Sequence, residues 1–481
     1  MKITMKTIIK ILHTTLNQNS RFKSMCSSLL FFMCINIPIF SQTYPDQESN
    51  TSTYGNYTLP NNGIPNYLNW FDAQLSDSRV MRITDRNTFG VNGQQLRHNY
   101  SKDQVWNSNE TRIKMAGYPA AILDAETYEF LYWSDIPSYG RWSNTQPYII
   151  YGTDGNSFVS HNVLSNSRTT LKTFNYQSVD FGFGEGNQDN FDKYVGLIGK
   201  NGNNRTLIVY DIQLNFIVGE KDLGSTQNID WFGVSQLGNY AVIMWKSDGN
   251  GNEQGVKSYD ITLNNETHIT DVTEHAALAI DAYGNEVLVS YGTEAQWNDQ
   301  HSLFMARLDG LGTTNLFPYI NGRGIWGGHI SARNINRPGW VYVSEQCCPT
   351  NPVAAAEVFA LKLDNSGTVE RYVKHNSYPS SYLHETQVVP NRNGTKVIFA
   401  SNWNDANEIN QQAAHDFVLE VNQGTLSITE VSVTPEQPTS VNYYNILGQK
   451  VSKQNLSKGI YIKELIYKNR VEHKKIVKAK N

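Results

Sequence analysis

The eight residues IVYDIQLN (208–215) decide the fold, because the chain repeats their pattern. A short apolar run ends in an acidic residue, and a polar turn follows. Similar copies are AAILDAET (120–127), HNVLSNSR (161–168), KSYDITLN (257–264), MARLDGLG (305–312), ALKLDNSG (360–367) and VLEVNQGT (418–425). The copies are anchored on Asp124, Asn166, Asp211, Asp260, Asp309, Asp364 and Asn422. Successive anchors are roughly 40–60 residues apart, which is typical of a repeat architecture.

A second apolar run precedes each copy, and most of these runs follow a Gly or Asn turn. Examples are AVIMW (241–245), VLVSYG (287–292), VYVSEQ (341–346) and VIFASNW (397–403). Several short strands per unit, repeated radially, are the signature of a β-propeller. A β-sandwich would not need this period, and a solenoid would have shorter, more uniform repeats. Seven copies predict an all-β chain with a seven-bladed propeller over residues 76–425, after an irregular lead-in over residues 42–75.

The bulk composition excludes two classes of partner. The 481 residues carry a net charge of −4, so no basic field indicates nucleic acid. After residue 41, no run approaches the roughly 20 apolar residues of a membrane helix. We therefore expect no nucleic-acid partner and no membrane-spanning segment.

Residues 1–41 predict a secretory signal peptide. Arg21 and Lys23 precede the apolar run SSLLFFMCINIPIFSQ (27–42), which ends in small and polar residues. A buried N-terminal helix is the alternative. Removal of this segment leaves Cys347 and Cys348, which are too few for a disulfide framework. A vicinal disulfide and two free thiols both stay open.

The repeat stops near residue 430. A Pro/Thr/Ser-rich linker is expected over residues 426–437, and a small β domain over residues 438–481. This domain contains YNILGQKV (444–451), LSKGIY (456–461) and KIVK (475–478). It resembles the C-terminal sorting domain of the type IX secretion system of Bacteroidetes. The resemblance implies that this machinery is a partner and that the protein is secreted or attached to the cell surface. A small adhesive β domain is the alternative.

Histidines recur at the expected start of three successive inner strands. The position about 12 residues before each second strand, where the inner strand should begin, is occupied by His275, His329 and His384. Imidazole nitrogens that meet near a propeller axis suit a divalent metal, and Gln387 could add an oxygen ligand. We therefore expect a divalent metal ion, with Mn, Ca and Zn all open. The alternative is that each histidine bonds the backbone of a neighbouring blade.

A second group of candidates consists of His98, Tyr100 and Lys102, which would share one face of a strand. Arg333 would share a strand face with His329, and a guanidinium can bind a carboxylate through two hydrogen bonds. A polar rim and an ion pair between blades are the alternatives. The candidates for substrate binding are Trp106, Asp230, Trp231 and Trp403, with Trp326 nearby. For each tryptophan, packing between blades is the alternative.

A secreted propeller with a His/Tyr/Arg rim resembles the seven-bladed polysaccharide lyases, which include oligogalacturonate lyase and the ulvan lyase propellers. The resemblance implies β-elimination on an extracellular uronic-acid-containing polysaccharide. It assigns neutralisation of the carboxylate to Arg333 and to a metal on the three histidines. Proton transfer would then be drawn from His98, Tyr100 and Lys102.

Two other functions compete with the lyase. A non-catalytic surface propeller could bind glycan or protein with structural histidines. A glycoside hydrolase on the same fold would need two facing carboxylates, for which Asp180, Asp230 and Glu385 are available.

Overall fold

The structure is a computed structural model of the chain. It describes residues 42–43, 59–91, 96–182, 186–247, 249, 251–292, 302–317, 328–346, 355–421, 440–445, 449–452, 459–466 and 471–478. The expected signal peptide, the linker over residues 426–437, Trp326, Cys347 and Cys348 lie outside the described residues. The chain separates into two compact units, residues 1–422 and 423–481. Among the described helices, none has the length and apolar character to span a bilayer.

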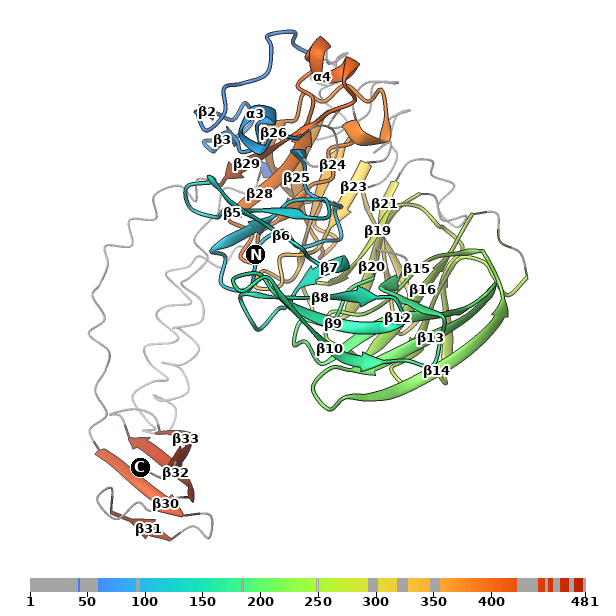
Figure 1. Ribbon diagram of the computed structural model, residues 1–481, viewed down its shortest axis with the longest axis vertical. Helices are drawn as coiled ribbons and strands as arrows, with labels where there is room; N and C mark the ends of the chain where they lie inside the picture. Colours follow the sequence, from blue (N-terminus) through green and yellow to red (C-terminus); the bar gives the residue numbers. More distant parts are fainter. Residues whose placement is uncertain are drawn as a thin grey trace, which may run out of the picture. The chain divides into compact units, whose positions relative to one another are not determined.

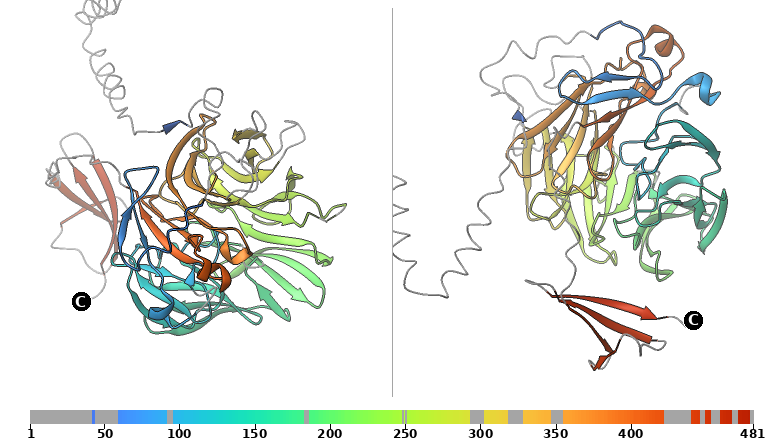
Figure 2. Two further views of the ribbon diagram at one scale, coloured as in Figure 1. Left: turned by 90° about the horizontal axis from the view of Figure 1, so that it is seen from above. Right: turned by 90° about the vertical axis from the view of Figure 1, so that its left-hand side faces the viewer.

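Within the described ranges, seven antiparallel sheets of the first unit form the blades of a β-propeller. The blades follow one another in chain order around the propeller, as the colours show (Figures 1 and 2). The first blade contains β4 (Arg112–Lys114), β5 (Ala120–Asp124) and β6 (Phe130–Ser134), with Trp106 bridged to Ile113 beside β4. The expected seven-bladed, all-β fold is confirmed.

The second to sixth blades each have four consecutive strands. The second contains β7 (Ser138–Trp142), β8 (Ile149–Asp154), β9 (Ser157–Asn162) and β10 (Ser167–Thr173), and the third β11 (Ser178–Asp180), β12 (Tyr194–Asn201), β13 (Asn204–Asp211) and β14 (Phe216–Ser225). The fourth contains β15 (Ile229–Val234), β16 (Tyr240–Trp245), β17 (Val256–Asp260) and β18 (Glu266–Thr270). The fifth contains β19 (Ala276–Ile280), β20 (Glu286–Gly292), β21 (Ser302–Arg307) and β22 (Thr313–Phe317). The sixth contains β23 (Gly328–Ser331), β24 (Trp340–Glu345), β25 (Glu357–Lys362) and β26 (Thr368–Lys374), with β1 (Gln42–Thr43) paired to β26.

The seventh blade joins the two ends of the propeller. Its strands are β27 (Val389–Pro390), β28 (Lys396–Ser401) and β29 (His415–Glu420), followed by β3 (Arg79–Arg82) and β2 (Trp70–Asp72) from the N-terminal part. Met81 of β3 lies opposite Val418 of β29 and opposite Trp70 of β2. Because β2 lies within the stretch expected to be an irregular lead-in, part of that stretch supplies a strand of the closing blade.

Seven apolar clusters lie between consecutive blades and explain the continuous apolar runs of the sequence. A strand between two neighbouring blades is buried on both faces, so it does not alternate polar and apolar residues. In β16, every residue from Ala241 to Trp245 is buried. One cluster contains Met81, Ile113 and Val418, which belong to the last and the first blade. The ring of blades is therefore closed by apolar packing as well as by strand pairing.

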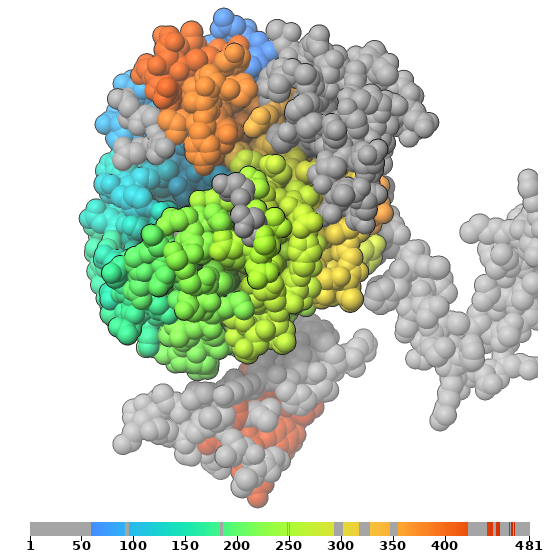
Figure 3. Space-filling model, turned by 90° about the vertical axis from the view of Figure 1, so that its right-hand side faces the viewer, coloured from blue at the N-terminus to red at the C-terminus, as the bar shows by residue number. Residues whose placement is uncertain are grey.

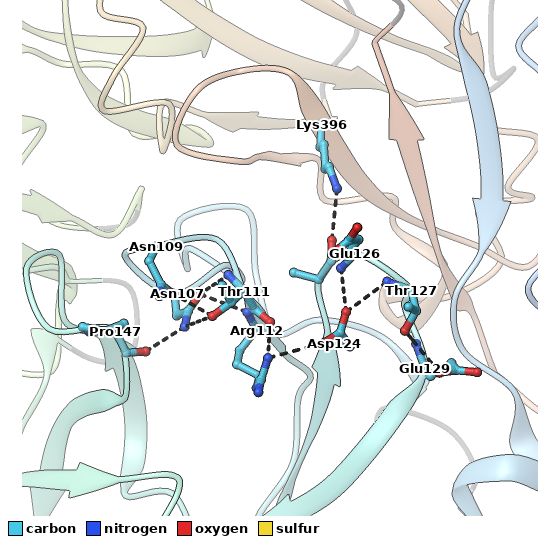
Figure 4. A network of polar contacts seen from close by, with 11 residues as sticks. Asn107, Asn109, Thr111, Arg112, Asp124, Glu126, Thr127, Glu129, Pro147 and Lys396 are labelled. Carbon is cyan, nitrogen blue, oxygen red and sulfur yellow. Dashed lines mark hydrogen bonds and ion pairs between the residues drawn. The ribbon is translucent and has the colours of Figure 1, made fainter. Parts of the chain in front are cut away.

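Among the described residues, the repeated acidic residue stabilises the turn after the repeated strand in five blades. Asp124 accepts hydrogen bonds from the backbone N–H groups of Glu126 and Thr127, at 2.9 and 3.0 Å (Figure 4). A short acidic side chain that bonds its own turn in this way favours a tight connection. At equivalent turns, a backbone N–H group likewise donates to the side-chain carboxylate of the repeated acidic residue. These residues are Asp211, Asp260, Asp309 and Asp364. In the second blade this role belongs to Asn162 at the end of β9, not to Asn166.

Contacts between the last blade and the N-terminal residues reinforce the closure. Lys396 Nζ donates to the carbonyl of Ala125, at 3.0 Å, in the same turn of the first blade (Figure 4). Two short helices, α3 (Arg86–Phe89) and α4 (Ala406–Asn410), are joined by an ion pair of 2.5 Å between Arg86 and Glu408. In Figure 3 the orange residues of the last blade accordingly lie beside blue N-terminal residues.

The second unit is a small antiparallel sheet. Its strands are β30 (Ser440–Asn445), β31 (Lys450–Val451), β32 (Gly459–Ile466) and β33 (Val471–Lys478), in the spatial order β31-β30-β32-β33. The expected small C-terminal β domain is confirmed.

Candidate functional site

The first strands of the fifth, sixth and seventh blades are neighbours, since β19 contacts β23 and β23 contacts β27. His275 directly precedes β19, and His329 is the second residue of β23. The centroids of the two imidazole rings are 4.5 Å apart, with an angle of 42° between the ring planes. The structure thus brings together the first two histidines of the predicted series.

Tyr100 and Glu385 complete a group that we call the His–Tyr cluster: Tyr100, His275, His329 and Glu385. The hydroxyl oxygen of Tyr100 lies 3.2 Å from Nδ1 of His275. The Tyr100 ring also stands edge-on to the His329 ring, with centroids 5.3 Å apart. On the opposite side, Nε2 of His329 lies 2.8 Å from Oε2 of Glu385. A phenol, two imidazoles and a carboxylate are therefore in continuous contact.

The surroundings of Glu385 keep this carboxyl group charged. Burial raises its pKa, but the hydrogen bond from His329 and the positive fields of His329, His275 and Arg97 together lower the pKa below its ordinary value. Glu385 therefore presents a charged oxygen to Nε2 of His329.

Tyr100 and Lys102 reach the site on a turn, not on the strand that the sequence suggested. The backbone N–H of Asp103 donates to the carbonyl of Tyr100, at 2.9 Å. The buried carboxylate of Asp103 is paired with Nζ of Lys114 at 2.6 Å, which anchors the turn to β4. Nζ of Lys102 lies 4.4 Å from the ring centroid of Trp231, a cation–π contact, and 5.9 Å from that of Tyr100.

His98 does not belong to the cluster. Its Nδ1 lies 2.8 Å from Oδ1 of Asp416, and its Nε2 contacts the backbone carbonyl of Gln387. The side chain is fully buried. Because both ring nitrogens bind protein groups, the structure gives His98 a structural position instead of the proton-transfer position assigned from sequence.

His384 is off register by comparison with the other two histidines. It ends the short 3₁₀ helix η4 (Tyr382–His384), and its Nδ1 lies 2.7 Å from Oγ of Ser380. The backbone N–H of Ala400 in β28 donates to the carbonyl of Thr386, so Thr386 lies beside the second strand of the seventh blade. Glu385, next to it, takes the place beside His329 that His384 was expected to occupy. Burial, followed by the charge of Arg97, lowers the pKa of His384.

The predicted metal ligands fit a metal ion only in part. Imidazole and carboxylate are ligand types that Mn²⁺ and Zn²⁺ accept, and the buried amide of Gln387 has no hydrogen-bond partner among the described residues. However, Nε2 of His329 and the carboxylate of Glu385 bind each other. Within the described ranges, no group of three or more His, Cys, Asp or Glu side chains is arranged to hold a metal ion. The described residues therefore offer candidate ligands but no assembled metal site.

Arg333 lies beyond the end of the strand that the sequence suggested. β23 ends at Ser331, so Arg333 does not share a strand face with His329. Arg333 lines a cavity with Lys102, Trp231 and Asn187. This cavity is distinct from the one that is lined by His329, His384 and Glu385.

The four candidates for substrate binding separate into two kinds. Trp106 is fully buried in the core between the last and first blades, and Trp403 stacks on Phe417 with ring centroids 4.8 Å apart. Neither ring lines the two cavities near the cluster. Trp231 lies under Lys102 and lines the second cavity, while Asp230 is a partly buried residue of β15. Only Trp231 is therefore placed to contact a ligand beside the cluster.

Three groups at the site were not assigned a role there from sequence. Glu385 was considered only as one of several carboxylates, because nothing in the sequence pairs it with His329. Arg141 and Arg392 join Arg333 at another cavity of the channel. They come from β7 and from the turn after β27, and no shared spacing relates them to Arg333.

The fold is a β-propeller whose fifth and sixth blades bring His275 and His329 together in the His–Tyr cluster, and comparisons with known proteins agree with the fold. No protein-family model and no curated protein matches the sequence. Among solved structures, the chain is similar to oligogalacturonate lyase from Vibrio parahaemolyticus, with a TM-score of 0.52 and 13% identity over 73% of this chain and 96% of that one. It is also similar to an oligogalacturonate lyase in complex with manganese, with a TM-score of 0.54, 10% identity and the same coverage. At this identity the likeness shows the fold alone.

Proposed function

We propose that the chain is a secreted lyase that cleaves a uronic-acid-containing polysaccharide by β-elimination at the His–Tyr cluster. The observation that carries this proposal is the 3.2 Å contact between the Tyr100 hydroxyl and Nδ1 of His275. A phenol bonded to an imidazole is a pair that can take up one proton and release another. The fold that the chain shares with oligogalacturonate lyases supports the same class of substrate.

Each bond of the elimination has a partner in this pair. The C5–H bond of the uronate breaks, its electron pair forms the C4–C5 double bond, and the C4–O bond breaks. His275 takes the C5 proton at Nε2, and Tyr100 gives its proton to the leaving oxygen. The Nδ1 proton of His275 then passes to the Tyr100 oxygen through their hydrogen bond, which returns both groups to their neutral forms.

Positive charge must stabilise the intermediate, since a proton next to a carboxylate is only weakly acidic. Lys102 is held over Trp231, at 4.4 Å from the ring centroid, and His329 is bonded to the charged Glu385. These two groups stabilise the carboxylate while the proton leaves C5. Lys102 thereby takes the role that the sequence assigned to Arg333.

The carboxylates favour the lyase over a glycoside hydrolase. A hydrolase of the usual kind needs a facing pair of carboxyl groups, one of them protonated. Asp180 is paired with Lys200 at 2.8 Å, and Glu385 with His329 at the same distance. Each of these carboxylates is thus engaged by a cationic or basic group.

Export through a type IX secretion system is part of the proposal. The resemblance of the tail rests on motifs that fall largely on the four-stranded sheet: YNILGQKV begins in β30, KGIY leads into β32, and KIVK ends β33. The tail is also a compact unit of its own. Mass spectrometry of the culture medium and of the cell surface tests this, because export should yield the propeller outside the cell with the tail cleaved or attached.

The activity is tested by incubating the full chain with oligogalacturonate, ulvan and other uronate polysaccharides while following ultraviolet absorbance of the new double bond. We expect a rise on at least one substrate, its loss in His329→Ala and its retention in the exposed control Tyr283→Phe. Folded protein that binds a uronate without any rise would favour the non-catalytic propeller. A parallel assay with a chelator and with added Mn²⁺ tests the metal expected from sequence.

A further inference from the structure

A third cavity in the propeller is lined by three arginines that the proposed reaction does not use. Arg141, Arg333 and Arg392 line it together with the amide side chains of Gln104, Asn144, Asn187 and Gln188. The arginines are 1%, 8% and 1% exposed. They lie on or directly after the first strands of the second, sixth and seventh blades, so residues far apart in the chain line the cavity together.

The positive charge around this cavity exceeds the negative charge that balances it. Nη1 of Arg141 is 3.4 Å from Oδ2 of Asp103, but that carboxylate oxygen is also 2.6 Å from Nζ of Lys114. In the described part of the chain, Arg333 and Arg392 form no ion pair. Burial, and then the fields of Arg141 and Arg392, lower the pKa of Arg333 to about 10. Burial likewise lowers the pKa of Arg392 to about 10, although the fields of Asp192 and Glu110 oppose this effect.

Two of the arginines hold the blades together through backbone carbonyls. Nε and Nη2 of Arg392 donate to the carbonyls of Asn107 and Ser143, at 3.1 and 3.3 Å, and its Nη1 donates to Asn144 Oδ1 at 2.7 Å. Arg141 donates to the carbonyl of Gly186 at 3.3 Å. Among the described residues, the Arg333 guanidinium makes one long hydrogen bond, of 3.4 Å to the carbonyl of Leu278. Arg333 thus has N–H capacity for a further acceptor in the cavity.

We propose that this cavity binds a small oxyanion, a sulfate, phosphate or carboxylate, between Arg333, Arg141 and Arg392. Guanidinium groups bind such anions through paired hydrogen bonds, and buried cations are stable when they are paired. The ligand would be either a free oxyanion or the carboxylate of a uronate sugar, which share this chemistry. A bound anion bridges the second, sixth and seventh blades and therefore stabilises the closed propeller.

Binding of a free oxyanion does not depend on the lyase activity, whereas binding of a sugar carboxylate rests on the proposed function. Thermal unfolding of the full chain tests both. Sulfate, phosphate and galacturonate are titrated at constant ionic strength, with chloride as the reference salt. We expect a saturable rise of Tm in the wild type, and at least a tenfold weaker apparent affinity in Arg333→Gln. The matched control Arg168→Gln, whose arginine pairs with Asp154 at the surface, should behave like the wild type.

A second measurement is needed if the wild type already holds its anion tightly, or if the variant Arg333→Gln folds poorly. Ion chromatography of the desalted, denatured wild-type protein should detect about one equivalent of anion if the ligand is already bound. Stabilisation by sulfate or phosphate identifies a free oxyanion, and stabilisation by galacturonate alone identifies a sugar carboxylate. No bound anion together with no saturable shift, or equal shifts in the wild type and Arg333→Gln, would overturn the proposal.

Discussion

The hydroxyl of Tyr100 lies 3.2 Å from Nδ1 of His275, although 175 positions separate the two residues in the chain. They meet because the turn before the first blade and the start of β19 both reach the centre of the propeller. Phenol and imidazole are groups that serve as general acid and base in enzymes, and the proposed elimination depends on this contact.

Tyr100→Phe removes the hydroxyl while keeping the ring against His329. We expect kcat to fall by about 10²–10⁴-fold with little change in KM, which is the usual contribution of a general acid or base. Steady-state kinetics on the best substrate measures this. Loss of less than threefold, roughly, would contradict a role for Tyr100 in proton transfer, and exposed Tyr283→Phe serves as the matched control.

Glu385→Gln should change the pH dependence of stability. Because the pKa of Glu385 is lowered in the folded protein, its charge stabilises the fold above the ordinary pKa of 4.5 and loses this effect as the pH falls through the folded value. The wild type should therefore have a higher Tm than Glu385→Gln at pH 7, by several degrees. The difference should shrink below about pH 4.5. A difference in Tm that grows as the pH falls would contradict a lowered pKa of Glu385 in the folded protein.

His384→Ala and His329→Ala separate a structural from a catalytic histidine. His384 is buried and bonded to Ser380, so its loss should lower the stability of the fold without a comparable loss of kcat. Loss of His329 should abolish the elimination. Kinetics per folded molecule, with elemental analysis of both variants, checks this. Equal loss of activity and of bound metal in both variants would instead support the three-histidine metal site.

Asp416→Asn tests the structural position of His98. Oδ2 of Asp416 accepts from the backbone N–H of His98 at 2.6 Å, and Oδ1 lies 2.8 Å from the ring. Leaving a buried donor or acceptor without its hydrogen-bond partner costs about 1–3 kcal/mol. We expect a loss of this size in the free energy of unfolding by urea, with kcat of the remaining folded protein nearly unchanged. A large loss of kcat without a loss of stability would return His98 to the proton-transfer group.

Met81→Ala tests closure of the propeller by the N-terminal strands. Met81 is buried between the last and the first blade, opposite Val418. Truncation of a buried methionine costs about 2–5 kcal/mol. Leu214→Ala, at a side chain that is 69% exposed, should cost less than about 0.5 kcal/mol. Equal effects in urea unfolding would contradict closure through β3.

The sequence predicts the blades well because each third strand repeats a local signal. An acidic residue such as Asp211 bonds its own turn, and this needs no knowledge of distant residues. The second copy was misplaced because Asn162 and Asn166 offer the same side chain four positions apart. Closure by β2 and β3 depends on pairing with β29, and no local pattern reveals that pairing.

The site was harder to predict than the fold, since it depends on how the loops reach the centre. His275 directly precedes its inner strand, and His329 is the second residue of its own. Counting back about 12 residues from each second strand therefore predicts their common position correctly. For the third histidine the same counting failed, because η4 and the left-handed Gln387 shift the chain and put Glu385 at the cluster. The sequence predicts that Tyr100 lies on the face of a strand, whereas in the structure a turn brings it to His275.

The mass of the reaction product tests the central claim most directly. β-Elimination adds no water, so each new non-reducing end should be an unsaturated uronate, lighter by one water than the corresponding product of hydrolysis. We predict this product from the wild-type chain, none from Tyr100→Phe under the same conditions, and full yield from Tyr283→Phe. Saturated products, or no products from folded chain that binds the polysaccharide, would contradict the lyase.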